Sequence, residues 1–287
     1  MIDLHIHSTA SDGTLHPHEI IAQAAAIGLE AIAITDHDSL KGVESALSQA
    51  IPPTLKFLTG VEISAAPPSS VRIAGSFHIL GYGIDPQDPD LCDSLRGLRK
   101  SRENRNPAII SKLNHLGIPI TLAEVIEAVG ECQLGRPHIA RVLVQKGVVR
   151  SIDEAFGRFL GSGKPAYVDK HRIGCQDALE RIRSAGGVPV LAHPGLLAFD
   201  THSGLADAVG ALVGMGLMGL EVFYPDHTPA FTEACRRLAR QHDLLMTGGT
   251  DFHGALTPEI QMGIGRGDLN VPFSLYETLV QHLRPTT

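Results

Sequence analysis

The chain has 287 residues, of which 43% are hydrophobic, and a formal net charge of −7. This length and composition allow a full buried core and exclude a disordered chain. The negative charge provides no basic field for a long polyanion, so local cations or metal ions would have to bind phosphate. We therefore expect a small or short substrate and no long duplex nucleic acid.

The sequence shows neither a membrane span nor an export signal. The N-terminal MIDLHIHS lacks a basic region, and no later stretch approaches the roughly 18 apolar residues of a transmembrane helix. We expect a cytoplasmic protein that does not associate with membranes. The cysteines form no Cys-x-x-Cys motif and are expected to be reduced core residues: Cys92, Cys132, Cys175 and Cys235.

Predicted strands and helices alternate along most of the chain. Runs rich in β-forming residues begin near residues 2, 29, 56, 77, 165, 188, 217 and 243, and most precede segments with helical spacing. Pro17 and Gly28 mark the ends of the first helix, and a second is expected over 39–50. Continuous apolar strands alternating with helices favour parallel strands covered by helices, closed into a barrel.

One region interrupts this alternation. From about Leu91 to Leu160 the pattern is helical and contains no convincing strand. Thr121 is expected to cap one helix, Pro137 to lie at the start of another, and residues 152–160 to form a third, short one. We therefore expect a barrel built from residues 1–90 and 161–287, interrupted by a helical cap domain over 91–160.

Histidine and carboxylate side chains recur at or near the ends of the predicted strands. Alternation in IDLHIH places His5 and His7 on one face of the first strand. This pair alone would fit an ordinary polar strand face equally well. Barrel enzymes, however, place their sites at the carboxyl ends of the strands. The repetition there favours a cluster of divalent metal ions, bound by His5, His7, Asp12, His37, Glu62, His78, His193, Asp251 and His253.

The motifs HIHSTASDG, ITDHD, GVEIS, AHP and the final D-x-H, with the isolated histidine at 78, resemble the polymerase and histidinol phosphatase (PHP) superfamily. The resemblance extends from His5 to His253 and implies a distorted α/β barrel of seven β/α units with two or three divalent metals. It implies three ligand sets: one of His5, His7, Glu62 and Asp251; a second that shares Glu62 with His78 and His193; and a third of Asp12, His37 and His253. Some relatives have histidine at the position of Asp12, which leaves the third metal open. His37, Glu62 and Asp251 would serve in catalysis.

Clustered metal ions suit phosphate esters, because one ion lowers the pKa of a bridging water while another polarises the phosphoryl oxygen. Mixed imidazole and carboxylate ligands fit manganese, zinc or iron, and the resemblance favours manganese. A structural zinc would more typically use four local ligands that include cysteine. The sequence therefore predicts a metal-dependent phosphoesterase.

Cations in the predicted cap are candidates for binding a substrate phosphate. Arg136 directly precedes a predicted helix N-terminus, where backbone amides and the helix dipole already favour an anion. Arg102, Asn106 and Lys41 are further candidates, although most of the basic run from Arg96 to Arg105 is typical of a solvated helix face. At another strand end, Glu221 and His227 are interpreted as either substrate-facing or locally packed.

A helical cap of this size resembles that of stand-alone nucleoside 3′,5′-bisphosphate phosphatases. The resemblance implies removal of the 3′-phosphate from adenosine 3′,5′-bisphosphate, which leaves AMP. The alternatives are a 5′-to-3′ exonuclease acting on short RNA or DNA oligonucleotides, a histidinol phosphate phosphatase, and a metal-binding accessory subunit like the domains fused to DNA polymerases. The complete set of ligand-type residues and the substrate-sized cap favour an independent enzyme.

Overall fold

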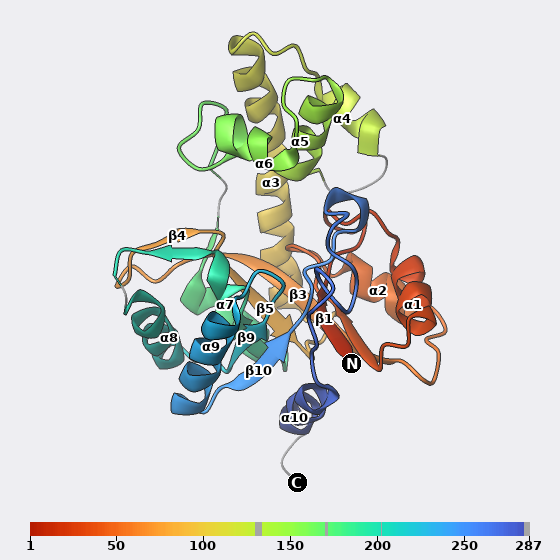
Figure 1. Cartoon of the computed structure of the whole chain (residues 1–287), viewed down its shortest axis with the longest axis vertical. Helices are drawn as coiled ribbons and strands as arrows, with labels where there is room; N and C mark the ends of the chain where they lie inside the picture. Colours follow the sequence, from red (N-terminus) through yellow and green to blue (C-terminus); the bar gives the residue numbers. More distant parts are fainter. Residues whose placement is uncertain (130–133, 170–171, 202, 284–287) are drawn as a thin grey trace.

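The computed structural model describes residues 1–129, 134–169, 172–201 and 203–283. A curved sheet lies among helices in the lower part of the molecule, and a group of helices stands above it (Figure 1). Within the described residues, no helix is both long and apolar enough to cross a membrane. Cys92, Cys175 and Cys235 are free thiols, as expected, and Cys132 lies outside the described residues.

Seven strands follow one another around the main sheet. Their order is β1 (Ile2–Ile6), β2 (Ala31–Ile34), β3 (Lys56–Ala66), β5 (His78–Tyr82), β7 (Val188–Leu191), β9 (Gly219–Phe223) and β10 (Leu245–Gly248). The short strand β6 (Ile173–Gly174) pairs with the end of β3. The sheet is nearly closed where Ile6 forms a parallel bridge with Phe252, whose carbonyl accepts a 3.0 Å hydrogen bond from the His7 amide. The expected α/β barrel is confirmed.

Strand β5 departs from the expected parallel arrangement. It runs antiparallel to both β3 and β7, whereas the other strand pairs along the path are parallel. Only residues 67–77 separate β3 from β5, which is too short for the helical crossover that a parallel pair requires. The reversal places His78, the first residue of β5, at the barrel end where the parallel strands finish.

Helices cover the outside of the barrel (Figure 1). They are α1 (Pro17–Ala26), α2 (Lys41–Leu47), α7 (Cys175–Ser184), α8 (Gly204–Gly214) and α9 (Pro229–Gln241), while α10 (Phe273–Leu283) lies below the sheet. The first begins at Pro17 and is followed by Gly28 at a φ of 77°, as predicted. The short strands β4 (Ile73–Gly75) and β8 (Leu197–Phe199) form a separate antiparallel pair, and 3-10 turns occupy η2 (Pro194–Leu196) and η3 (Gly254–Leu256).

The strand expected near residue 165 is absent from the described residues. Residues 161–169 form turns and irregular backbone instead. Pro165 has no amide hydrogen for a strand ladder. The next residue, Ala166, is fully buried in the core of the upper helices, and its amide donates a 3.0 Å hydrogen bond to the Phe159 carbonyl. This short apolar run therefore packs as a turn against helices and does not extend the sheet.

The upper group consists of α3 (Pro89–His115), α4 (Leu122–Val129), α5 (Arg136–Gln145), α6 (Ile152–Ala155) and the π-helical turn η1 (Phe156–Leu160). Thr121 caps α4 as predicted, because its hydroxyl accepts a 3.1 Å hydrogen bond from the Glu124 amide. Helix α3 is shared: Leu91 and Leu95 belong to the barrel core, and Ile109 and Leu113 to the core of the upper helices. The division into domains at residues 90 and 160 stays a prediction.

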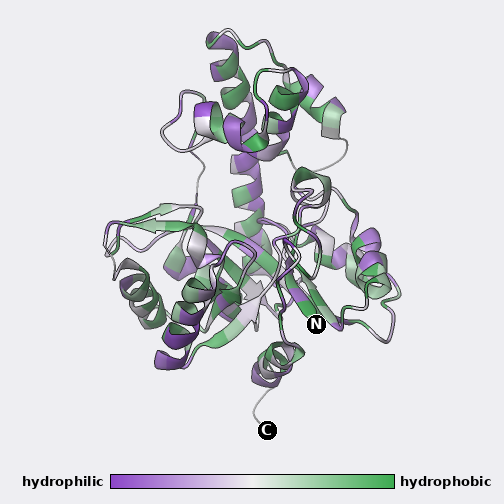
Figure 2. Cartoon of the chain, in the orientation of Figure 1, coloured by the Kyte–Doolittle hydropathy of each residue, from purple (hydrophilic) through white to green (hydrophobic). Residues whose placement is uncertain are grey.

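The barrel strands are apolar along most of their length, as the green strands of Figure 2 show. Within them, Asp3, His5, Glu62 and Glu221 are nevertheless fully buried. Ionisable groups are rarely buried this completely unless they are paired or bind metal. The strands therefore place ionisable side chains in the buried interior of the protein.

Candidate metal centre

The predicted ligands meet at one end of the barrel. Glu62 lies on β3, and His37, just beyond β2, forms an isolated parallel bridge with it. His193 follows β7, and Asp251 follows β10. Glu62 was expected at or near the end of its strand, but it lies four residues before the end of β3, which continues to Ala66 while pairing with β5 and β6. The long strand places the Glu62 carboxylate between the neighbouring ligand-bearing segments.

Three overlapping groups of side chains have ligand-type atoms within 4.8 Å of one another. They are His5, His7, Glu62 and Asp251; His37, Glu62 and His78; and His7, Asp12, His37 and His253. His193, which these groups omit, places Nε2 2.9 Å from Glu62 Oε1 and 3.2 Å from His78 Nδ1. The structure thus brings all nine predicted ligands together, and the first group is the set that the family resemblance implied.

The Glu62 carboxylate divides the histidines between its two oxygens. Oε2 lies 3.6, 3.2 and 2.7 Å from ring nitrogens of His5, His7 and His37, respectively. Oε1 lies 2.8 and 2.9 Å from ring nitrogens of His78 and His193. A carboxylate in this position can contact two cations at once, one through each oxygen.

Several polar atoms of this cluster are buried without a hydrogen-bond partner in the described part of the chain. They are Nε2 of His5, Nε2 of His7, Oδ1 of Asp12, Nδ1 of His37, Oε2 of Glu62 and Nδ1 of His193. An unsatisfied buried polar group costs about 1–3 kcal/mol, so a cluster of them requires an explanation. Nitrogen and oxygen donors converging in this way fit divalent cations such as manganese, zinc or iron.

The charge state of the cluster also fits cations. Burial would raise the pKa of Glu62, but the nearby His37, His78 and His5 hold it well below its usual range. Burial would likewise lower the pKa of His7, but the carboxylates of Asp251 and Glu62, 3.0 and 3.2 Å from its Nε2, raise it to about 10. The pKa values of His5 and His193 are raised as well, whereas burial lowers that of His37, so without metal protonated His5, His7 and His193 balance the carboxylates. A divalent ion would replace those protons.

A further layer of polar groups orients the predicted ligands. Asp36 accepts hydrogen bonds of 2.7 and 2.6 Å from the hydroxyls of Ser8 and Ser11. The Tyr224 hydroxyl donates to Asp251 at 3.1 Å, and Glu221 contacts two of the histidines. The sequence analysis did not assign these supporting roles. The flanking carboxylates of the TDHD motif were the available signal for Asp36.

A cavity of about 660 Å³ extends from the candidate metal centre to the helices above it. Asp12, His37 and His78 line it from the barrel, which we call the barrel end, and Arg105 on α3 and Arg136 on α5 line it from the upper helices, which we call the basic end. Such a volume is typical of pockets that bind small molecules. The cavity therefore joins the ligand cluster to a set of basic side chains.

Arg136 lines this cavity as the first residue of α5. One amino group donates to the Leu160 carbonyl at 3.0 Å, and the guanidinium carbon lies 5.4 and 5.5 Å from the ring centroids of Phe156 and Tyr167. Cation–π contacts of this kind stabilise a fixed orientation. The guanidinium is therefore held in place before any ligand binds.

The other predicted phosphate ligands have different surroundings. Arg102 lines the cavity, but its guanidinium forms a buried 2.8 Å ion pair with Asp38. Asn106 is buried and donates to the Leu134 carbonyl at 2.9 Å, and it does not line the cavity. Lys41 is exposed at the start of α2, also outside the cavity lining. Their roles in binding substrate stay predictions.

Arg105 was expected on a solvated helix face, with most of the basic run from Arg96 to Arg105. Its side chain lines the cavity and is buried. Burial lowers the pKa of Arg105 to about 10, and the charges of Arg136 and Arg102 add to this effect. The signal in the sequence was its spacing of three residues from Arg102, which places both on one helix face.

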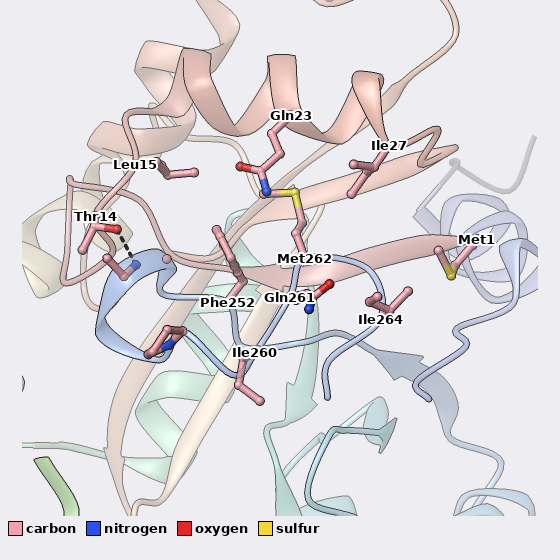
Figure 3. A pocket seen from close by; sticks show the side chains of 13 residues that line it. Met1, Thr14, Leu15, Gln23, Ile27, Phe252, Ile260, Gln261, Met262 and Ile264 are labelled. Atoms are coloured by element: carbon pink, nitrogen blue, oxygen red, sulfur yellow. Dashed lines mark hydrogen bonds between the residues drawn. The ribbon is translucent and has the colours of Figure 1, made fainter. Parts of the chain in front are cut away.

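A second cavity, of about 600 Å³, lies beneath α1 (Figure 3). Leu15, Ile27 and Met262 contribute to its mainly apolar lining, and the Thr14 hydroxyl accepts a 2.8 Å hydrogen bond from the Ala255 amide at its edge. None of the nine predicted ligands lines this cavity. The candidate functional site is therefore the cavity below the upper helices, which several of the predicted ligands line.

Comparison with known proteins agrees with this geometry. Residues 3–116 match the model of the PHP domain. The chain is 34% identical over 252 residues to the 5′-3′ exoribonuclease of Haemophilus influenzae, covering 88% of this chain and 89% of that protein. It is also 34% identical over 254 residues to the 3′,5′-nucleoside bisphosphate phosphatase of Chromobacterium violaceum, covering 88% and 87%. A proposed metal-dependent phosphoesterase from Bifidobacterium adolescentis superposes with a TM-score of 0.84 at 29% identity, covering 98% of this chain and 95% of that one.

The nearly closed barrel, the convergent histidines and carboxylates and these similarities define a metal-dependent phosphoesterase, and therefore a hydrolase. The chain belongs to the PHP family. The resemblance noted from the sequence motifs is confirmed.

Proposed function

We propose that this chain removes the 3′-phosphate from nucleoside 3′,5′-bisphosphates, converting adenosine 3′,5′-bisphosphate to AMP and phosphate. The observation that carries the proposal is the cavity with candidate metal ligands at one end and guanidinium groups at the other. A molecule with two phosphates suits both ends. Similarity to the bisphosphate phosphatase of Chromobacterium violaceum supports the same substrate.

The charges along the cavity favour a terminal phosphate at the basic end. Asp38 compensates Arg102 at 2.8 Å, and Asp169 compensates Arg172 at 2.7 Å. Among the described residues, no carboxylate forms an ion pair with Arg105 or Arg136. Two uncompensated positive charges match the dianion of a phosphate monoester better than the single charge of an internal phosphodiester. Guanidinium groups also bind phosphate oxygens in bidentate fashion.

The nine clustered side chains would hold two or three divalent ions, for which we propose manganese, with zinc or iron as alternatives. Bound ions would supply an activated water and stabilise the departing alkoxide. Glu62 would hold cations through both oxygens, while His37 and Asp251 would contribute to catalysis as ligands beside it. Arg136 and Arg105 would bind the 5′-phosphate and thereby orient the 3′-phosphate over the ligand cluster. The binding energy of the 5′-phosphate would then increase the rate of hydrolysis at the 3′-phosphate.

A 5′-to-3′ exonuclease acting on short RNA or DNA is the second candidate. It is favoured by the 34% identity to the exoribonuclease of Haemophilus influenzae, which equals that to the phosphatase. In this case the arginines would bind the 5′-phosphate of the oligonucleotide, and the first phosphodiester would lie at the ligand cluster. The two candidates share one anion-binding end and differ in the bond that is cleaved.

The experiment compares product release from four substrates by the manganese-loaded protein: adenosine 3′,5′-bisphosphate, adenosine 3′-monophosphate, a short 5′-phosphorylated oligonucleotide and histidinol phosphate. We expect the highest kcat/KM with the bisphosphate, at least roughly tenfold above the 3′-monophosphate, because one charge-assisted contact contributes about 1.5–3 kcal/mol. A higher kcat/KM with the oligonucleotide would select the exonuclease. A higher value with histidinol phosphate would overturn both candidates.

A further inference from the structure

Glu221, on β9, is fully buried behind the candidate metal centre. Its Oε1 lies 2.9 Å from Nδ1 of His5, and its Oε2 accepts a 2.6 Å hydrogen bond from the backbone amide of His193. His5 lies on β1, whereas His193 follows β7, the strand next to β9. One carboxylate therefore connects two predicted ligands that come from distant parts of the chain.

The contact with His5 determines which ring nitrogen faces the centre. An ionised carboxylate accepts hydrogen bonds and cannot donate, so the proton of neutral His5 must lie on Nδ1. The lone pair of Nε2 is then exposed to the cluster, 3.3 Å from Asp251 Oδ1 and 3.6 Å from Glu62 Oε2. That nitrogen has no hydrogen-bond partner among the described residues. Glu221 thereby leaves it available to a cation.

The contact with His193 stabilises an unusual backbone conformation. His193 has a φ of 26°, in the left-handed region that residues other than glycine rarely adopt. Its amide is bound by Glu221, and the amide of Gly195 donates to Nε2 of His227 at 3.1 Å. Both acceptors come from β9 or the segment after it. The resulting corner places His193 Nε2 2.9 Å from Glu62 Oε1.

We propose that Glu221 is a positioning residue that sets the ligand atoms of two candidate metal sites at once, through the tautomer of His5 and the backbone of His193. The inference rests on the metal centre within the proposed function and adds a residue to it. Partners that orient metal-binding histidines from behind typically change metal affinity or activity by about 10- to 100-fold when they are replaced.

Glu221→Gln separates this role from simple packing, because the shape of the side chain is kept. An amide offers one accepting oxygen and one donating nitrogen, whereas both partners of Glu221 donate. If the amide nitrogen faces His193, two donors oppose each other. If it faces His5, the proton of His5 must move to Nε2 and occupy the ligand atom. Either orientation perturbs one of the two predicted ligands.

The experiment measures manganese binding to the full chain by calorimetry and by metal content after dialysis. We expect Glu221→Gln to bind at least one equivalent about 10- to 100-fold more weakly than the unsubstituted chain. Glu180→Gln is the matched control, because Glu180 is exposed on α7 and accepts a hydrogen bond from Gln176 on the same helix. In the zinc-loaded protein, where His5 would be neutral, its ring-nitrogen NMR signals should show the proton on Nδ1, and Glu221→Gln should alter that signal.

Manganese affinity within twofold of the unsubstituted chain, combined with a lower melting temperature, would overturn the inference, because Glu221 would then act only in packing. If Glu221→Gln shows no cooperative unfolding, Glu221→Asp takes its place. Its shorter carboxylate cannot reach both partners, so unchanged metal affinity in that variant also overturns the inference. Normal manganese binding without hydrolysis of the bisphosphate would reject the proposed substrate and leave this test of Glu221 intact.

Discussion

Replacing Arg105 by glutamine should make the substrate-free protein more stable and the enzyme less active. The Arg105 side chain is only 6% exposed, and its Nε has no hydrogen-bond partner within the described chain. Burial and the charges of Arg136 and Arg102 lower its pKa from 12.5 to about 10. No carboxylate of the described residues forms an ion pair with this buried cation, and an anionic ligand in the cavity would neutralise it.

The gain in stability follows from the direction of this pKa change. A base whose pKa is lower in the folded state opposes folding at every pH below that folded value, and the penalty disappears as the pH rises above about 10. One pKa unit corresponds to about 1.4 kcal/mol, so the decrease from 12.5 to about 10 sets an upper limit of about 3.5 kcal/mol on this penalty. Water in the cavity reduces this value, and glutamine adds a polar amide of its own. We expect the free energy of unfolding to rise by about 1–2 kcal/mol.

The loss of activity should depend on the substrate. A charge-assisted hydrogen bond to phosphate contributes about 1.5–3 kcal/mol, which corresponds to a roughly 10- to 150-fold decrease in kcat/KM. This decrease should appear with adenosine 3′,5′-bisphosphate. Adenosine 3′-monophosphate lacks the phosphate that Arg105 would bind, so its kcat/KM should change little.

The assay pairs urea unfolding without substrate with steady-state kinetics on both nucleotides. Lys100→Gln is the matched control, because Lys100 is exposed on the same helix and its loss changes the net charge by the same amount. The control should leave both the stability and the substrate preference unchanged. If Arg105→Gln destabilises the protein and lowers kcat/KM equally for both nucleotides, Arg105 supports the fold and the proposed phosphate contact is wrong.

Four further predictions test the remaining parts of the site. Arg136→Ala should lower kcat/KM for the bisphosphate roughly tenfold or more and change that for the 3′-monophosphate little; equal losses would contradict phosphate binding. Glu62→Gln should remove more than one manganese equivalent or nearly all turnover, and unchanged metal content would refute the shared carboxylate. Chelator-treated protein should be inactive and recover with manganese, so full activity in metal-free protein would exclude metal dependence. At pH 8, manganese should displace a proton from His7, whose pKa is raised to about 10. Because the buffer takes up this proton, the calorimetric heat of manganese binding should vary with the ionisation enthalpy of the buffer, and a heat that does not vary would refute this. The stability that protonated His7 gives the metal-free protein is present below its ordinary pKa of 6.5 and is lost as the pH rises through about 10.

The ligand cluster was predictable because its signals are local. Alternation along β1 determines that His5 and His7 share a face, and the parallel strands deliver Asp251 and His193 to the same end of the barrel. The direction of β5 was not deduced, although the short connection before it already excluded a helical crossover. The position of Glu62 within its strand depends on the pairing of β3 with β5 and β6. Such long-range pairing leaves little trace in the residues themselves.

The basic end of the cavity was less predictable because its burial depends on tertiary contacts. Arg102 and Arg105 lie in a strongly charged segment whose composition indicates solvent exposure. They are buried because the same helix continues into the upper group, where Ile109 and Leu113 pack in a core with residues of α5. Their partners also differ, since Asp38 neutralises Arg102, whereas no carboxylate of the described residues forms an ion pair with Arg105. No local pattern in the sequence distinguishes these two arginines.

The two ends of the cavity place opposite demands on a ligand. The barrel end gathers carboxylates and imidazoles that fit cations, whereas the basic end gathers guanidinium groups that fit an anion. In the ligand-free protein, the buried polar groups of the barrel end and the buried cations of the basic end both lower the free energy of unfolding. Ligands that bind the folded state should therefore stabilise it by mass action. Metal ions alone satisfy the first end and leave Arg105 and Arg136 uncompensated. A substrate with a phosphate at each end satisfies both, so selection by this site should follow the spacing of two phosphates more closely than the identity of the base.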